Sequence, residues 1–396
     1  MLIKKLTDAC GLPGQEKEVR DIIKAELEGH ADGMRTDRLG NLIAVKTWGQ
    51  AAAGVQSGGA GAGARNCPAG DGADAQAGPH IALCAHMDEV GLCIRAIDKD
   101  GYLKFASWGI DARVLHSKSV LVGKDRIPGV IGAAPIHLLP PEKRSSPVPA
   151  DKLYIDIGAK NKEDAEKRVS IGDFAAFAGE YTEFGDHKIK AKALDDRIGC
   201  AAIIEVMKGT GAAVALKGPD TAEAEGAVSD VLTDGAETAG KTGCKLTGIF
   251  TTQEEVGLRG AAVAAYAVDA DLAIVIEGTI CADTAEEDER QVTAQGLGPV
   301  VYIADRTSVF QKKYIDSITA VAQRHGIPYQ FKKAAAGGTD SARFHQAKGG
   351  TPCIGLAVAC RYIHSPVSTV DKRDYENLVK LVRLYVAEFF AGGAGK

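Results

Sequence analysis

Residues 81–91, IALCAHMDEVG, decide the fold, because an apolar run typical of a buried strand ends there in a histidine and an aspartate. Three further apolar runs end in the same way: KLTGIFTTQEEVG (245–257), DLAIVIEG (271–278) and CIGLAVACRYIHSP (353–366). In open α/β sheets the groups just beyond the carboxyl ends of the strands gather in one crevice. We therefore expect an α/β fold whose crevice collects the polar residues of these four segments. They are His86, Asp88, Glu254, Glu255, Glu277 and His364.

A fifth segment, KALDDRIGCAAIIEVM at 192–207, places Asp195 and Asp196 directly before a predicted helix. Together the five segments supply two imidazoles and several carboxylates, with no cysteine at the same positions. This is the ligand set expected for zinc, cobalt or manganese. The number of ligands suits two metal ions better than one.

Two of these pairs also have explanations that need no metal. His86 and Asp88 are two positions apart, so on a strand they share a face, and Asp88 could accept the proton of the ring nitrogen turned away from a metal ion. Both residues could equally lie in a surface loop. Asp195 and Asp196 could be a helix N-cap with an acidic first turn.

The remaining residues are open to the same doubt when each is taken alone. Glu254 and Glu255 could form an ordinary polar loop, or one could bind metal while the other handles protons. Glu277 could be a strand-end carboxylate without a role, and His364 could be a core histidine. The segment at 337–340, GGTD, could line a substrate cleft or simply form a turn before a helix. The presence of all five segments in one chain favours the metal site.

Composition excludes several classes of partner. The chain has 396 residues and a net charge of -5, and its acidic and basic residues are mixed, so no basic stripe predicts binding to nucleic acid or to a membrane surface. The first residues lack the features of a signal peptide, and no apolar run approaches about 18 residues. We expect a cytoplasmic protein. Its nine cysteines form no CxxC pair, so we expect them to be reduced and mostly buried.

The pattern along the chain indicates two domains. Short β-like pieces separated by turns at 92–183 predict a small β domain inserted into a larger α/β domain, which comprises 1–91 and 184–396. Two stretches rich in alanine and glycine, 49–79 and 209–243, have few large apolar side chains, and we expect them to be flexible surface insertions.

The order of the motifs HMDEVG, ALDDR, TTQEEVGLRGA, EGT and RYIHSP resembles that of the tetrahedral aminopeptidase family, which includes glutamyl aminopeptidases and proteins once labelled endoglucanases or cellulases. The similarity spans almost the whole chain, from LTDACGLPGQEKEVRDII and DRLGNLIA to AAAGGTDSARFH. It implies a zinc-peptidase-like α/β/α sandwich with a central mixed sheet. It also implies that 92–183 is a small, β-barrel-like domain that pairs subunits.

The resemblance assigns a role to each residue of the crevice. The matching metal ligands are His86, Asp195, Glu255, Glu277 and His364, with Asp195 as the bridge between two ions. Glu254 matches the general base, and Asp88 matches the carboxylate that orients the histidine ligand. Asp196 matches the second residue of a strained Asp–Asp turn. Glu277 stands where many members carry an aspartate, and its longer side chain can still coordinate a metal ion.

By this resemblance the chain is a dinuclear metallo-aminopeptidase that removes N-terminal residues from peptides. A water molecule activated by two divalent ions, zinc in first place and otherwise cobalt or manganese, attacks the peptide bond while Glu254 transfers the proton. One metal ion contacts the free α-amino group. Members assemble from dimers into hollow tetrahedral shells of twelve subunits, which restricts their substrates to short peptides.

Two alternatives remain open at this stage. A related dimetal hydrolase could instead remove an acyl group or a C-terminal residue, because the metal cage does not fix which end of the substrate is held. A catalytically silent shell protein could keep the metal ions for structure. The sequence also leaves open an acidic, aliphatic or basic preference at the N-terminal residue.

Overall fold

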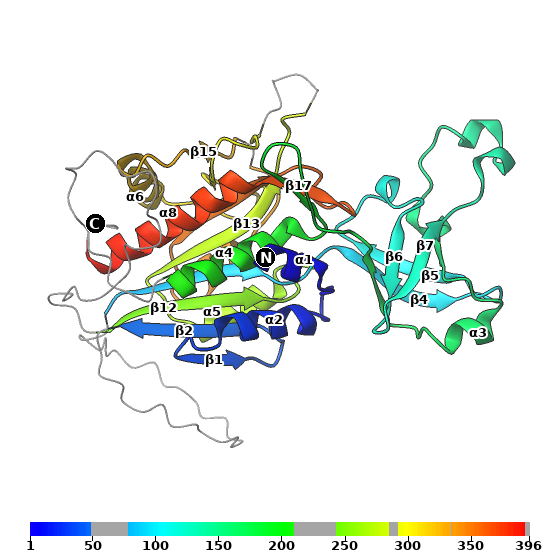
Figure 1. Ribbon diagram of the computed structural model, residues 1–396, viewed down its shortest axis with the longest axis horizontal. Coiled ribbons are helices and arrows are strands. Elements are labelled where there is room, and N and C mark those ends of the chain that lie inside the picture. The colour runs from blue at the N-terminus through cyan, green and yellow to red at the C-terminus, as the bar shows by residue number, and fades with distance from the viewer. Residues whose placement is uncertain (49–77, 210–242, 285–291, 334, 393–396) are drawn as a thin grey trace, which may run out of the picture.

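A computed structural model describes most of the chain as a large domain from which a small β-barrel projects (Figure 1). The described residues are 1–48, 78–209, 243–284, 292–333 and 335–392. The two predicted insertions, at 49–79 and 209–243, fall almost entirely outside these ranges, so their predicted flexibility stays a prediction.

The main sheet of the large domain has eight strands in the order β1-β2-β12-β3-β13-β16-β14-β15. Their bounds are β1 (Gly33–Thr36), β2 (Leu42–Trp48), β3 (His80–His86), β12 (Cys244–Thr251), β13 (Leu272–Ile280), β14 (Val300–Val301), β15 (Gln330–Phe331) and β16 (Cys353–Cys360). The four central strands, β12, β3, β13 and β16, are parallel to one another, whereas β2 and β14 run antiparallel beside them. The predicted mixed sheet is confirmed.

Helices cover both faces of this sheet. Their bounds are α1 (Leu2–Asp8), α2 (Lys17–Leu27), α4 (Leu194–Gly209), α5 (Arg259–Ala267), α6 (Lys312–Arg324), α7 (Ser341–Gln346) and α8 (Lys372–Phe390). A Cβ atom at Gly248 of β12 would meet Ile203 of α4. On β3, Leu83 is paired with Gly248, so the next residue, Cys84, points to the other face, where it contacts Asp340 just before α7. The sheet is therefore the middle layer of an α/β/α sandwich, as predicted.

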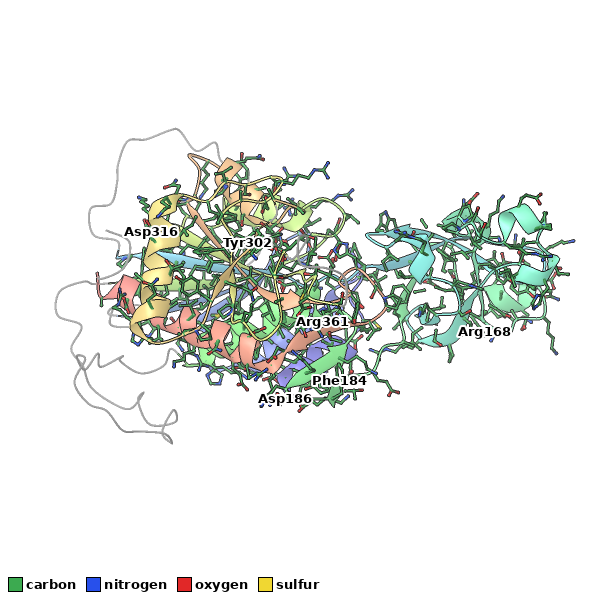
Figure 2. All side chains as sticks on the ribbon, turned by 90° about the horizontal axis from the view of Figure 1, so that it is seen from above. Arg168, Phe184, Asp186, Tyr302, Asp316 and Arg361 are labelled. Atoms are coloured by element: carbon green, nitrogen blue, oxygen red, sulfur yellow. The ribbon has the colours of Figure 1, made fainter. Side chains whose placement is uncertain are left out.

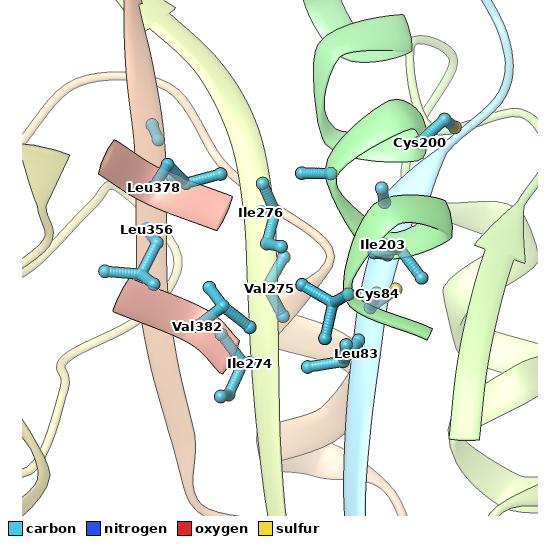
Figure 3. Packing of buried hydrophobic residues seen from close by; sticks show 14 of the residues in the cluster. Leu83, Cys84, Cys200, Ile203, Ile274, Val275, Ile276, Leu356, Leu378 and Val382 are labelled. Atoms are coloured by element: carbon cyan, nitrogen blue, oxygen red, sulfur yellow. The ribbon is translucent and has the colours of Figure 1, made fainter. Parts of the chain in front are cut away.

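The core explains why the central strands are largely apolar. Leu83 of β3 and Ile203 of α4 lie close together on one part of the sheet, and Leu356 of β16 lies beside Val382 of α8 (Figure 3). Full burial of each such side chain contributes about 1.5–3 kcal/mol. This packed core positions the carboxyl edge of the sheet, where the polar residues lie. Cys84, Cys353 and Cys360 are free and buried in this core, as expected for small apolar side chains.

The second domain is a closed barrel of strands in the order β4-β5-β8-β7-β6-β9. Their bounds are β4 (Gly91–Ile97), β5 (Leu103–Trp108), β6 (Ser119–Val122), β7 (Ile127–Gly132), β8 (Tyr154–Asp156) and β9 (Phe174–Phe177), with α3 (Lys162–Glu166) beside β4. The barrel has an apolar core of its own. Figure 2, seen from above, shows it well apart from the large domain, with Arg168 on the barrel side. The predicted barrel-like domain is confirmed, and its role in dimerisation stays a prediction.

A small three-stranded sheet lies where the chain returns from the barrel to the large domain. It consists of β10 (Thr182–Phe184), β11 (Lys188–Ala191) and β17 (Ser368–Asp371), all antiparallel. β11 ends shortly before Asp195, and β17 begins shortly after His364, so pairing of these strands brings two predicted ligands toward each other. In the part of the chain that the structure describes, no helix has the length and apolar character needed to span a membrane.

Candidate metal centre

The carboxyl edge of the sheet brings a first set of three predicted ligands together. His86 is the last residue of β3, Glu277 lies in β13, and Asp195 lies at the start of α4. The Nε2 atom of His86 is 3.4 Å from Oδ1 of Asp195 and 3.6 Å from Oε2 of Glu277. His86 is only 1% exposed. One imidazole nitrogen thus faces two carboxylates in a buried setting.

A second set shares Asp195 with the first. His364, in the loop after β16, places its Nε2 atom 3.6 Å from Oδ2 of Asp195 and 3.5 Å from Oε2 of Glu255, in the loop after β12. In each set the three ligand atoms lie within 4.8 Å of one another. Asp195 therefore turns one oxygen to each set, which is the arrangement of a carboxylate between two cations. With its side chain 46% exposed, His364 is not a core histidine.

Buried oxygen atoms without partners test whether cations fit here. Oδ1 of Asp195 and Oε1 of Glu277 are buried, and neither accepts a hydrogen bond from a described residue. An uncompensated buried carboxylate is costly, and a divalent cation supplies the missing positive charge. Imidazole and carboxylate together form a hard-to-borderline donor set that suits zinc, cobalt or manganese. The residues present fit two divalent cations.

The electrostatics of the protein alone point the same way. Burial raises the pKa of Glu277 and of Glu254 well above the ordinary value, and it raises the pKa of Glu255 to about 7. The carboxylate of Asp195 raises the pKa of His364 to about 9. Burial thus favours the protonated forms of these three glutamates, which is the behaviour expected where acidic side chains are crowded together.

The two adjacent aspartates have different tasks. Neither Asp195 (φ -88°, ψ 107°) nor Asp196 (φ -122°, ψ 40°) is helical, and the peptide bond between them is cis. The carboxylate of Asp196 accepts hydrogen bonds from the backbone N–H of Gly199 at 3.0 Å and of His86 at 3.3 Å. Asp196 thus has the capping role that the sequence allowed for this pair of aspartates. Asp195 does not cap the helix, and its side chain faces the two histidines.

Asp88 connects the histidine to the loop that carries the two glutamates. Its Oδ1 and Oδ2 atoms accept the backbone N–H groups of Glu254 at 2.9 Å and of Glu255 at 3.0 Å. The Nδ1 atom of His86 lies 3.0 Å from the carbonyl oxygen of Asp88 and 3.6 Å from its Oδ1 atom. Asp88 therefore orients the ring chiefly through its carbonyl group, while its carboxylate fixes the position of both glutamates.

A buried ion network beneath the Asp–Asp turn was not expected from the sequence. The Nζ atom of Lys192 lies 2.7 Å from Oε1 of Glu89, and the Nη2 atom of Arg197 lies 3.2 Å from the same atom. Arg197 also donates to the carbonyl oxygen of Met87 at 2.8 Å. The network joins the loop after β3 to the start of α4. Its signal in the sequence is a charged residue beside the ligands in both HMDEVG and ALDDR.

Asp340 is a second buried acid whose role the sequence left open. It directly precedes α7, but its side chain does not cap that helix. Its Oδ2 atom accepts a hydrogen bond from Thr251 at 2.6 Å, its Oδ1 atom has no partner among the described residues, and burial raises its pKa to about 6. The GGTD segment therefore places a carboxylate against the end of β12, directly before the loop of Glu254.

An open cleft of about 520 Å³ lies beside His364, between the two domains. Its walls are Gly109, Asp111, Val114 and Lys118 of the barrel domain and residues 362–367 of the large domain. At Gly109 a Cβ atom would stand 3.1 Å from Oε2 of Glu255, so a loop of the barrel domain reaches the second ligand set. The cleft thus opens directly beside the second ligand set.

The comparisons with known proteins place this fold in a peptidase family. The chain belongs to the M42 glutamyl aminopeptidase family, whose model matches residues 70–215 and 227–381. A protein of Acetivibrio thermocellus is 33% identical over 381 residues, which cover 96% of each chain. The lysyl aminopeptidase of Pyrococcus furiosus is 28% identical over 394 residues, which cover 98% of this chain and 96% of that relative.

Solved structures agree with this assignment. The TET aminopeptidase of the marine sediment archaeon Thaumarchaeota archaeon SCGC AB-539-E09 has a TM-score of 0.80 and 29% identity, covering 99% of this chain and 98% of that one. For the TET1 peptidase of Pyrococcus horikoshii, which can assemble into a tetrahedron or a large octahedral shell, the TM-score is 0.73 and the identity 30%, with coverage of 97% and 98%. The resemblance found in the motifs is confirmed, and the chain is a peptidase of this family.

Proposed function

We propose that the protein is a metallo-aminopeptidase that holds two divalent cations, zinc in first place, and releases N-terminal residues from short peptides. The observation that carries this proposal is Asp195, whose two oxygens face two separate sets of ligands. His86 and Glu277 complete one set, and Glu255 and His364 complete the other. When bound, the two cations lower the pKa of water and polarise the carbonyl group of the scissile peptide bond.

Glu254 is the proposed general base. It lies in the loop held by Asp88, and one of its carboxylate oxygens lies within 4.8 Å of ligand atoms of His86 and Glu255. Burial raises its pKa well above the ordinary value, which suits a group that must accept a proton from water and then release it. Glu254 then delivers this proton to the departing amine.

Hydrolysis of aminoacyl anilides by the purified protein tests the proposal. We expect turnover of substrates with a free α-amino group, loss of turnover after chelation, and recovery when zinc, cobalt or manganese is added back. Anilides of N-acetylated amino acids are the matched control. Cleavage of the acetylated substrates alone would favour the deacylase alternative, and metal binding without any turnover would favour the silent shell.

The assembly and location are part of the same proposal. The barrel exposes large apolar side chains, namely Val130, Ile136, Leu138 and Ile171. Together with the shells formed by the TET1 peptidase, this supports pairing of subunits through the barrel and assembly into a tetrahedral homododecamer in the cytoplasm. Such a shell would admit peptides and exclude folded proteins. Light scattering that finds only monomers in metal-containing buffer would contradict the assembly.

A further inference from the structure

Glu16, directly before α2, is a buried carboxylate that contacts the loop of the proposed general base. The residue is only 2% exposed. Its Oε1 atom accepts the backbone N–H of Gln253 at 3.1 Å and so joins two segments that are 237 residues apart. The same atom accepts the N–H of Gly14 at 2.7 Å. The segment between α1 and α2, dark blue in Figure 1, therefore lies against the residue that directly precedes Glu254.

Gln253 has a backbone conformation that needs support from its surroundings. Its φ is 55°, in the left-handed region, which is unfavourable for a residue with a Cβ atom. Such a conformation persists where the surrounding structure fixes it. At Gln253 the chain turns from the end of β12 toward Glu254. The conformation of Gln253 therefore determines the direction in which the next side chain leaves the loop.

Side chains from three separate segments hold the N–H groups of this loop. The four consecutive N–H groups of residues 252–255 each donate to a side chain, namely that of Asn41 at 3.0 Å for the first, Glu16 for the second and Asp88 for the last two. The carbonyl groups of the first three residues of the loop accept N–H groups of residues 257–260. The backbone around the proposed base is thus fixed on both sides, and Glu16 holds its left-handed residue.

Glu16 acts on the loop and not on the metal ligands themselves. Among the described residues, it forms no hydrogen bond or ion pair with a proposed ligand. The ligand Glu255 is kept in place by Asp88 and, once a cation is bound, also by that cation. Glu254 is not a ligand and lacks this second constraint. A displacement of the loop should therefore affect the base more than the ligand beside it.

We propose that Glu16 is a positioning residue for Glu254: by holding Gln253, it directs the carboxylate of the base at the attacking water. This inference rests on the proposed aminopeptidase function and adds a residue to its machinery. Glu16 takes no part in bond cleavage itself and acts on the rate through Glu254. Because a shift of about 1 Å in a reacting group can lower a rate about 100-fold, a contact of this kind can control turnover.

The test replaces Glu16 by a side chain of similar length that has no acceptor for these N–H groups. In zinc-loaded Glu16→Met we expect kcat for a free-amine anilide to fall about 10-fold to 100-fold, with KM and metal content little changed. Glu16→Gln keeps an acceptor oxygen and should restore most of the rate. Glu18→Met is the matched control and should keep the wild-type kcat, because the hydrogen bonds of Glu18 go to Cys10 and Arg126 and not to this loop.

A double-mutant cycle shows whether Glu16 acts through the base. In protein that already carries Glu254→Gln, the further change Glu16→Met should lower the residual kcat by less than about 3-fold, because two residues that act through one group have non-additive effects. Glu16→Asp, whose carboxylate is one carbon shorter, replaces Glu16→Met if that variant does not fold. It should show the same selective fall in kcat to a smaller extent.

Other results overturn the inference. A wild-type kcat in Glu16→Met, or an equal loss with and without Glu254→Gln, would mean that Glu16 does not position the base, while the aminopeptidase function stands. Loss of bound zinc in parallel with kcat would assign Glu16 to metal binding instead. Absence of turnover by the wild-type protein with every free-amine substrate would remove the proposed function itself.

Discussion

Strand β3 carries a buried histidine at each end, and the two ends differ in what surrounds the ring. At the start of the strand, His80 contacts the carbonyl oxygen of Asp269 and the hydroxyl group of Thr247, and burial lowers its pKa to about 4. At the end of the strand, burial acts in the same direction on His86, but the carboxylates of Asp195 and Asp88 raise its pKa well above the ordinary value.

The difference teaches how to distinguish a structural histidine from a ligand. Both rings are buried and both lie at an end of the same strand, so burial alone does not separate them. His80 has one neutral partner for each ring nitrogen, so nothing is left to bind. His86 faces Oδ1 of Asp195, a buried carboxylate oxygen that has no hydrogen-bond partner among the described residues. A metal centre is thus marked by surplus acceptors around the imidazole.

Replacement of the shared ligand Asp195 should have the largest effect, because it acts on the metal-binding end of β3 and leaves the His80 end unchanged. Asp195→Asn keeps the shape of the side chain but removes the charge that faces both histidines, so we expect loss of tight binding of both cations. We expect kcat/KM to fall by at least about 1,000-fold. Metal analysis after gel filtration and initial rates with a free-amine anilide would measure the two effects.

The matched control lies at the other end of the strand. His80→Gln should leave metal content and kcat/KM near the wild-type values at neutral pH, because its partners are neutral groups of the sheet. Equal loss of metal in His80→Gln and Asp195→Asn would mean that general disruption of β3, and not the shared carboxylate, governs metal binding.

Replacing the proposed base should separate metal binding from catalysis. Glu254→Gln keeps the hydrogen bond from its backbone N–H to Asp88, so the loop and both ligand sets should persist. We expect unchanged metal content and a fall in kcat of about 100-fold to 10,000-fold. Turnover that survives this change would show that another group transfers the proton.

Asp88→Asn should have a smaller effect that falls on metal affinity. The amide can accept only one of the two N–H groups that the carboxylate now accepts, so Glu254 and Glu255 lose part of their fixed position. We expect affinity for zinc to fall by about 10-fold to 100-fold, with activity partly restored by excess metal. Competition with a chromophoric chelator measures this change, and an unchanged affinity would assign Asp88 to local stability alone.

Much of the carboxyl edge of the main sheet could be predicted from the sequence, because the patterns that indicate it are local. Apolar runs that end in His86, Glu254 or His364 reveal both the strands and the polar groups that follow them. The two-residue spacing from His86 to Asp88 also predicted their association. The individual roles were predicted from the resemblance in motif order. This includes the position of Asp195 between the two ligand sets, which no spacing rule specifies.

The features that could not be predicted from the sequence depend on contacts between distant segments. Lys192 and Arg197 pair with Glu89 across about a hundred residues, and nothing in their local pattern tells a buried charge from an exposed one. The segment of Asp340 was predicted either to line a substrate cleft or to form a turn before a helix, and its contact with Thr251 was not predicted because it requires the packing of α7 on the sheet. The cleft between the domains likewise depends on how the barrel sits beside His364.

The smallest expected effect concerns stability at the His80 end. Because the folded-state pKa of His80, about 4, is below the ordinary value of 6.5, the unfolded chain binds a proton between these pH values and the folded protein does not. Stability therefore falls as pH is lowered through this window, by about 2 kcal/mol between pH 7 and pH 5. Urea unfolding at both pH values measures the change, and His80→Gln should lack this contribution; an identical pH dependence in the variant would contradict the assignment.

The most direct test of the central claim, that Asp195 lies between two cations, is the number of metal ions bound per chain in the wild-type protein and in His364→Ala. We expect two ions in the wild type and one in the variant, because His364 belongs to only one of the two ligand sets. A single ion in the wild type, or the loss of both ions in His364→Ala, would contradict the account of two separate sets that share one carboxylate.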